Sequence, residues 1–139
     1  MNSSRAGYRE APHTADVALE VWAQDLPELF EQAARGLFGL VAATEPGAPD
    51  QVERRVSLVA PDWETLLVDW LNELLALSDE HQEAFVTFDV ELSEPGRLSA
   101  HILGTRAYSP RRAIKAATFH GLEIRRGPNG YRTVIVFDV

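Results

Sequence analysis

The sequence has 139 residues, of which 45% are hydrophobic and 24% charged, and these values are typical of one soluble globular domain. It contains no cysteine, which excludes disulfide scaffolds, thiolate metal sites and thiol nucleophiles. It also has neither the roughly 20 consecutive apolar residues of a membrane span nor the apolar segment of a secretion signal. We therefore expect a cytoplasmic protein with no membrane partner.

The net charge of −8 is unevenly distributed along the chain. Residues 1–96 carry five arginines against nineteen acidic residues, a balance of −14, whereas residues 97–139 carry eight basic residues against two acids, a balance of +6. Such asymmetry indicates an oriented interaction surface, but arginines placed singly on strand edges would contribute only to solubility. Composition leaves both interpretations open. The negative net charge of the chain argues against RNA binding by the isolated protein.

The first half of the chain predicts a strand, a helix, a second strand and a second helix. Residues 17–22 alternate in the manner of a strand. Apolar residues then recur every three or four positions over residues 26–42, which predicts a helix with Asp25 as its N-cap and Glu28 reaching back in a capping box. Residues 52–60 predict a strand, and Asp62 is expected to cap the second helix. The buried face of that helix holds Leu66, Leu67, Trp70, Leu71, Leu74 and Leu75.

The second half predicts strands at residues 85–92, 97–103, 117–125 and 131–138, with a surface connection at residues 104–116. Strand alternation places Phe85 and Phe88 on opposite faces, which predicts one core ring and one exposed ring. We expect an α+β fold, with a flexible start at residues 1–7 and a single compact domain at residues 8–139. In this fold two helices pack on one face of a mostly antiparallel or mixed sheet.

The sequence lacks the short motifs of common enzyme classes. It has no phosphate-binding loop, no Gly-rich dinucleotide turn and no nucleophile elbow, and its four histidines show no helix-spaced zinc pattern. These absences favour an accessory protein over an enzyme.

Carboxylates at two distant places in the sequence are candidate metal ligands. The segment His13-Thr14-Ala15-Asp16 precedes the first predicted strand, and Asp138 is followed directly by the terminal carboxylate of Val139. If the last strand pairs near the start of the first, three carboxylates converge and repel one another, which a cation relieves. Oxygen-only ligands favour Ca²⁺, Mg²⁺ or Mn²⁺ over zinc. The alternative for the first segment is a local turn in which Asp16 or Thr14 bonds its own backbone.

Five motifs in order resemble the archease family over nearly the whole chain, from about Tyr8 to Val139. They are His13–Val17, Asp25–Ala34, Leu66–Leu75, Lys115–Leu122 and Val136–Val139.

The resemblance implies a compact α+β fold and a role as protein cofactor of an RtcB-type RNA ligase. That ligase joins RNA 2′,3′-cyclic phosphate or 3′-phosphate ends to 5′-hydroxyl ends in tRNA splicing and RNA repair. Archeases promote its guanylylation and multiple turnover, so we expect a non-catalytic protein that contacts RNA or GTP only within the complex.

The resemblance also implies a site for a divalent cation, with Ca²⁺ the first expectation and Mn²⁺ or Mg²⁺ the alternatives. Its ligands correspond to Asp16, Asp138 and the Val139 carboxylate. His13, Lys115 and His120 are candidates for contact with a metal ligand or with the partner. The alternatives are a solvated lysine at a strand end for Lys115 and a structural hydrogen bond for His120.

The chain departs from the family pattern between Gly104 and Lys115. This segment is shorter and basic, and it lacks an acidic residue and a histidine found in many relatives, so no family role is transferred to the Arg106–Arg112 loop. A general chaperone or protein-interaction module with a structural metal is the alternative function. A metal-dependent hydrolase would need a general base near the ion, for which His13 is the only obvious candidate.

Overall fold

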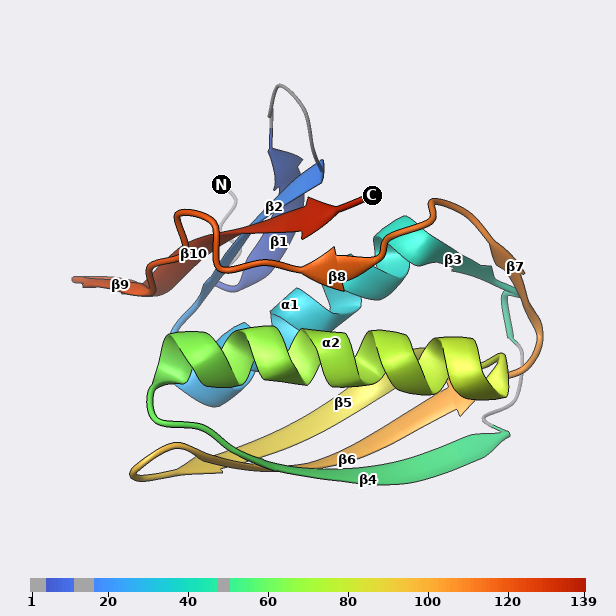
Figure 1. Cartoon of the computed structure of the whole chain (residues 1–139), viewed down its shortest axis with the longest axis horizontal. Helices are drawn as coiled ribbons and strands as arrows, with labels where there is room; N and C mark the ends of the chain where they lie inside the picture. Colours follow the sequence, from blue (N-terminus) through green and yellow to red (C-terminus); the bar gives the residue numbers. More distant parts are fainter. Residues whose placement is uncertain (1–4, 12–16, 48–50) are drawn as a thin grey trace.

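The computed structural model describes residues 5–11, 17–47 and 51–139, and within them the strands form three antiparallel sheets (Figure 1). The five-stranded sheet has the order β1 (Gly7–Ala11), β2 (Val17–Ala23), β10 (Gly130–Asp138) and β8 (Ala116–Ala117), and β9 (Arg125–Gly127) also pairs with β10. The three-stranded sheet has the order β4 (Val52–Val59), β6 (Arg97–Thr105) and β5 (Ala84–Ser93), while β3 (Ala42–Thr44) pairs with β7 (Tyr108–Pro110). Two helices, α1 (Leu26–Val41) and α2 (Trp63–His81), lie between the two larger sheets.

Helix α1 begins at the predicted cap and packs against both larger sheets. Asp25 Oδ1 accepts a hydrogen bond from the Glu28 amide at 2.9 Å, and Glu28 Oε1 accepts one from the Gln24 amide at 3.2 Å. The predicted reciprocal cap is therefore confirmed. Gly36 lets α1 approach β2 closely, because a Cβ at this position would overlap the Leu19 side chain. This close contact compensates for the low helix propensity of glycine.

Helix α2 begins at Asp62, whose Oδ1 accepts a hydrogen bond from the Thr65 amide at 2.7 Å, as predicted. On this helix, the indole nitrogen Nε1 of Trp70 donates a hydrogen bond to the carbonyl oxygen of Phe30 at 3.0 Å. Trp70 and Phe30 are fully buried, and this bond satisfies the one polar group of the indole. It also ties α2 to α1 at the centre of the core.

The prediction for Phe85 and Phe88 is wrong, because both rings are buried, with exposed fractions of 1% and 3%. The register of β5 against β6 shifts between Phe85 and Thr87. Such a bulge adds one residue to the alternation, so side chains three positions apart reach the same face. Phe38 contacts both rings, with centroid separations of 5.5 and 6.0 Å.

The predicted strand at residues 117–125 is also wrong, because only its two ends are strands, in β8 and β9. Between them the Leu122 amide donates to the Phe119 carbonyl at 3.0 Å, and Gly121 adopts a φ of +63°. The chain therefore turns away from the sheet here. The expected connection at residues 104–116 contains the short strand β7.

The predicted α+β class with two helices is confirmed, and the strands are all antiparallel. The sequence did not indicate that the strands separate into two larger sheets, each in contact with the helices. Of the helices in the described part of the chain, neither is long and apolar enough to cross a membrane.

Candidate functional site at the end of strand β10

Strand β10 lies between β2 and β8 and ends at the candidate ligands. Phe137 faces Val17 of β2 on one side and Ala117 of β8 on the other, and Asp138 faces Ala116. Phe137 is fully buried, whereas Val139 is 51% exposed and Asp138 is exposed. The buried ring therefore anchors the strand, and the next two residues carry their carboxylates out of the core.

The pairing of β10 with β2 meets the condition on which the predicted metal site depends. Because Phe137 lies opposite Val17, β2 begins one residue after Asp16 at the sheet end that carries Asp138. Asp16 and His13 themselves lie outside the described residues. The convergence of the three carboxylates therefore stays a prediction. Within the described ranges, no group of three His, Asp or Glu side chains is placed to hold a metal.

The side chain of Asn72 on α2 holds β8 in place. Asn72 Oδ1 accepts a hydrogen bond from the Ala117 amide at 2.7 Å, and Asn72 Nδ2 donates to the Ala117 carbonyl at 3.2 Å. On its other edge β8 pairs with β10, and the Lys115 amide donates to the Asp138 carbonyl at 2.8 Å. Strand β8 thus fixes the backbone of Asp138, and Asn72 supports β8. Sequence reasoning missed this residue, although a polar side chain within an apolar helix run was the available signal.

Lys115 and His120 both lie on segments attached to the end of β10. Lys115 is exposed and is placed by its backbone bond to Asp138. Thr118 Oγ1 donates to the Val136 carbonyl at 2.9 Å and accepts from the His120 amide at 3.2 Å. The structure therefore brings Lys115 and His120 to the same end of the sheet as Asp138.

The loop that carries His120 is also held by α2 and presents an exposed ring. Glu64 Oε2 accepts a hydrogen bond from the Ile124 amide at 3.1 Å. Phe119 on this loop is 54% exposed. Val139, which follows Asp138, is 51% exposed, so two apolar side chains on these segments are open to solvent.

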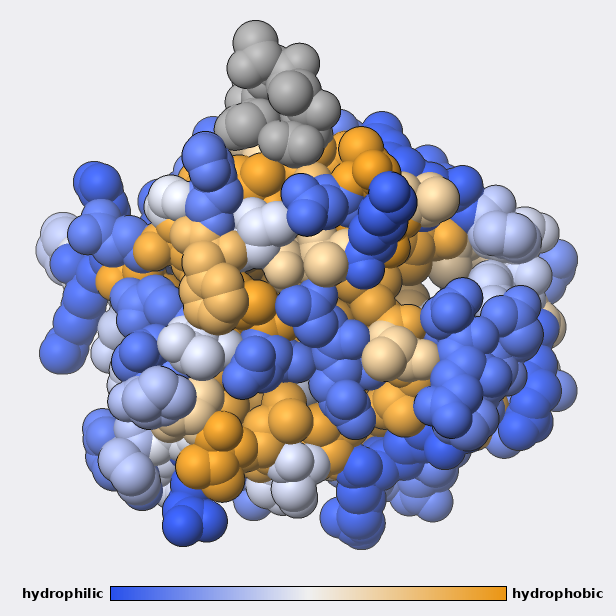
Figure 2. Space-filling model, viewed as in Figure 1, coloured by the Kyte–Doolittle hydropathy of each residue, from blue (hydrophilic) through white to orange (hydrophobic). Residues whose placement is uncertain are grey.

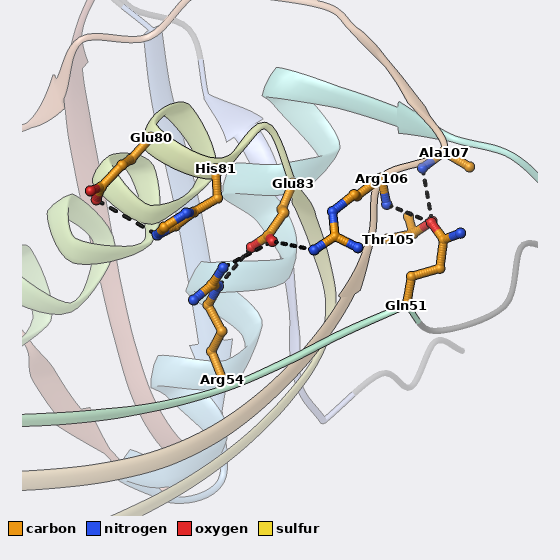
Figure 3. A network of polar contacts seen from close by, with 8 residues as sticks. All are labelled: Gln51, Arg54, Glu80, His81, Glu83, Thr105, Arg106 and Ala107. Carbon is orange, nitrogen blue, oxygen red and sulfur yellow. Dashed lines mark hydrogen bonds and ion pairs between the residues drawn. The ribbon is translucent and has the colours of Figure 1, made fainter.

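The Arg106–Arg112 loop is bound to the body of the protein. Arg54 donates to both carboxylate oxygens of buried Glu83, at 2.7 and 2.9 Å, and Arg106 lies 3.5 Å from the same carboxylate (Figure 3). The Arg54 guanidinium lowers the pKa of Glu83, against the opposing effect of burial. Further along the loop, Arg111 donates to the Gly39 carbonyl at 2.9 Å.

Arginines of the basic C-terminal part form ion pairs with acids of the N-terminal part. Arg112 contacts Glu10 at 2.9 Å, and Arg132 contacts Glu20 at 2.7 Å. Together with Arg106, these residues show that the charge asymmetry of the sequence is partly neutralised in three dimensions.

The structure defines a small α+β protein whose central strand ends in exposed carboxylates. A family model of the archease protein family matches residues 8–139. The protein archease of Methanosarcina mazei is 35% identical to this chain over 147 aligned positions, and the alignment covers 100% of both chains. That of Methanothermobacter thermautotrophicus is 35% identical, with 91% of this chain and 94% of the relative covered.

Two solved structures have a similar fold. The solution structure of protein 1598 of Methanobacterium thermoautotrophicum matches with a TM-score of 0.78 and 28% identity, covering 96% of this chain and 99% of the other. A crystal structure from Thermotoga maritima, described as an archease and possible chaperone, matches with a TM-score of 0.62 and 25% identity, covering 94% and 96%. The chain belongs to the archease family.

Proposed function

We propose that this protein is a metal-binding accessory protein that activates an RtcB-type RNA ligase, promoting its guanylylation and multiple turnover in tRNA splicing and RNA repair. The observation that carries the proposal is the β2–β10 register, in which Phe137 faces Val17. This register starts β2 directly after Asp16 at the sheet end where β10 delivers Asp138 and Val139. Membership of the archease family supports the same assignment.

The donors available at this end fit a hard divalent cation. Asp138 and the Val139 carboxylate offer only oxygen as a donor atom, and both residues are exposed. With Asp16 as third ligand, this set favours Ca²⁺, with Mn²⁺ or Mg²⁺ as alternatives. When bound, such an ion neutralises charge on phosphoryl oxygens. Within the protein, Asn72 and β8 hold Asp138 in position for this role.

The neighbouring exposed side chains fit contact with a protein partner. Phe119 is 54% exposed and Val139 51% exposed, and large apolar side chains of this kind are enriched in the buried cores of interfaces. Lys115 adds a positive charge beside Asp138, suitable for a phosphate or for an acidic residue of the ligase. RNA and GTP are contacted within that complex.

The proposal is tested by multiple-turnover RNA ligation with the ligase of the same host at limiting concentration. We expect stimulation by the wild-type protein and its loss with Asp16→Ala, whose circular dichroism should remain native. Stimulation that survives this substitution would contradict the role of the metal site.

The terminal carboxylate is tested separately by adding one glycine after Val139. This extension keeps every side chain but moves the carboxylate, so calorimetry should show weaker binding of Ca²⁺ or Mn²⁺. A control is Asp79→Asn, which removes an exposed acid of α2 far from the proposed donors in the sequence. Unchanged binding by the extended chain would remove Val139 from the ligand set.

A general chaperone with a structural metal site is the second candidate function. The description of the Thermotoga relative as a possible chaperone favours it, as does the exposed ring of Phe119. It predicts protection of several unrelated proteins from aggregation and a lower melting temperature after metal removal. Stimulation of one ligase without such general protection would contradict it.

A further inference from the structure

A groove lies between the C-terminal half of α2 and residues 106–115, which lead from β6 to β8. It has a volume of about 920 Å³ and is lined on its two sides by residues such as Leu75 and Ile114. In Figure 1 the segment that carries β7 passes beside the end of α2, and Figure 2 shows a hollow between the two. We call it the α2 groove.

Apolar side chains form part of the wall of the α2 groove. Leu75, Tyr108 and Ile114 pack against the core and are only partly buried. Each therefore leaves apolar surface in the groove, and covering such surface with a second apolar group releases its hydration water. Tyr108 is the only aromatic residue among the described residues of the lining.

The rim of the groove is positively charged. Its described lining holds three basic residues, Arg106, Arg112 and Lys115, against one acidic residue, Asp79. Arg112 contacts Glu10 at 2.9 Å, with side-chain exposures of 42% and 48%. An ion pair this exposed contributes little energy, so a carboxylate brought by a partner can replace Glu10.

Arg106 carries a charge that its own ion pair does not fully use. The two oxygens of the Glu83 carboxylate accept hydrogen bonds from Arg54 at 2.7 and 2.9 Å, and Arg106 reaches one of them only at 3.5 Å (Figure 3). Two guanidinium groups thus face one carboxylate, which leaves one positive charge in excess. Because the Arg106 side chain is 61% exposed, it is free to turn toward a second carboxylate in the groove.

Backbone hydrogen bonds hold this wall of the groove in place. The Arg112 amide donates to the Leu40 carbonyl at 3.1 Å, and β7 pairs with β3. Toward β8, the Lys115 amide donates to the Asp138 carbonyl at 2.8 Å. A site that is ordered before its partner arrives loses less conformational entropy on binding.

We infer that the α2 groove is the docking site for a segment of a partner protein in which acidic and apolar residues are interleaved. The acidic residues pair with Arg106, Arg112 and Lys115, which supply charge-assisted hydrogen bonds and complementary charge. The apolar residues cover Leu75 and Ile114. That the partner is the RNA ligase rests on the proposed function.

The same observations disfavour a nucleotide or a nucleic-acid strand as the occupant. Bases bind to proteins by stacking on aromatic rings, and the described lining offers only Tyr108. Phosphate groups would also leave Leu75 and Ile114 uncovered. The net charge of −8 repels a long polyanion more strongly than a short segment with few carboxylates.

The groove lies beside the proposed metal site. Lys115 lines the groove and is bound through its amide to Asp138. A partner segment in the groove would therefore bring the rest of its protein against the end of β10, where the carboxylates are exposed.

The chemistry of the groove is tested by nuclear magnetic resonance on the nitrogen-15-labelled full chain. The probe is a short peptide in which glutamate and leucine alternate, and two matched peptides carry glutamine for glutamate or serine for leucine. We expect amide shifts at groove residues such as Ala76 and Ile114 with the first peptide. Each matched peptide should bind at least about fivefold more weakly, because it lacks either the charge or the apolar surface.

A pair of variants of equal net charge tests the arginines. Arg106→Gln with Arg112→Gln should keep the fold, because Arg54 still pairs with Glu83, and should bind the glutamate–leucine peptide at least about fivefold more weakly. The control is Arg55→Gln with Arg97→Gln, two exposed arginines of the three-stranded sheet that do not line the groove. Its affinity should stay within about twofold of wild type, because salt screens remote charges.

Three results would overturn the inference. The first is shifts that gather away from the groove, or equal affinity for all three peptides. The second is tighter binding of inorganic tripolyphosphate than of the glutamate–leucine peptide, which would make the groove a phosphate site. The third is a set of groove shifts that changes on dilution of the chain alone, which would make a second copy the occupant.

The identity of the partner is tested by ligase stimulation at increasing concentrations of this protein. The variant Arg106→Gln with Arg112→Gln should need at least about fivefold more protein for half-maximal stimulation, with the maximal rate unchanged. An unchanged half-maximal concentration would contradict docking of the ligase in the groove. If the wild-type protein gives no stimulation, the proposed function fails, and the peptide experiment still decides the inference.

Discussion

Replacing Asn72 by alanine tests whether α2 holds the candidate site in place. The substitution removes both hydrogen bonds to Ala117, at 2.7 and 3.2 Å. A hydrogen bond of this kind contributes about 0.5–1.5 kcal/mol, so the local loss is about 1–3 kcal/mol. Alanine is a better helix former than asparagine by up to about 0.7 kcal/mol, which offsets part of the loss in the free energy of global unfolding.

Amide hydrogen exchange at Ala117 is therefore the sharpest readout. Its amide donates to Asn72 Oδ1 and faces away from β10, whereas the Lys115 and Thr118 amides donate to carbonyls of β10. Removal of Asn72 should lower the protection of the Ala117 amide by about 5-fold to 150-fold, as about 1–3 kcal/mol implies.

The control for this experiment is Asp79→Ala on the same helix. Asp79 is exposed, and we expect its removal to change the free energy of unfolding by no more than about 0.5 kcal/mol. Unchanged protection of Ala117 in the Asn72→Ala variant would refute the reasoning that α2 supports β8 and, through it, Asp138.

Three further predictions concern other parts of the fold. Arg54→Ala leaves Glu83 buried without its main partner, so urea unfolding should show a free energy of unfolding lower by about 2–4 kcal/mol. Arg125→Ala removes an exposed ion pair and should lower it by at most about 1 kcal/mol. The pKa of Glu83 is lowered from 4.5 in the folded protein, so the ion pair with Arg54 stabilises the fold fully above pH 4.5. The loss of stability in Arg54→Ala should therefore shrink as the pH falls below 4.5. A loss of stability that grows in acid would contradict the role of this ion pair. Burial raises the pKa of Glu31, so folding disfavours its charged form. Glu31→Gln should therefore be at least as stable as wild type at pH 7, and the difference in stability should vanish in acid. A large loss of stability at pH 7 would show that the negative charge itself is needed. Phe119→Ser should leave the melting temperature within about 2 °C, because the ring is 54% exposed, while reducing ligase stimulation several-fold; full stimulation would exclude this ring from the interface.

The helices could be predicted from the sequence because their signals are local. The caps at Asp25 and Asp62 need only a side chain and an amide three residues later, and the apolar periodicity identifies the buried face. Strand positions were less predictable. The bulge between Phe85 and Thr87 depends on pairing with β6, which no alternation within β5 reveals.

The residues of the candidate site also differ in whether a local pattern of the sequence points to them. Asp138 could be identified because its position at the end of an apolar strand is visible in the sequence. The role of Asn72 depends on contact with Ala117, 45 residues away, and periodicity carries no information on that distance.

The measurement that tests the central claim most directly is the rate of guanylylation of the host's RtcB-type ligase with labelled GTP. The assay compares wild-type protein, Asp138→Asn and the control Asp79→Asn, with circular dichroism to verify each fold. The account predicts acceleration by wild type and by the control, and little or none by Asp138→Asn. Equal acceleration by all three proteins would contradict a role for the carboxylates at the end of β10, and acceleration by none would contradict the ligase assignment itself.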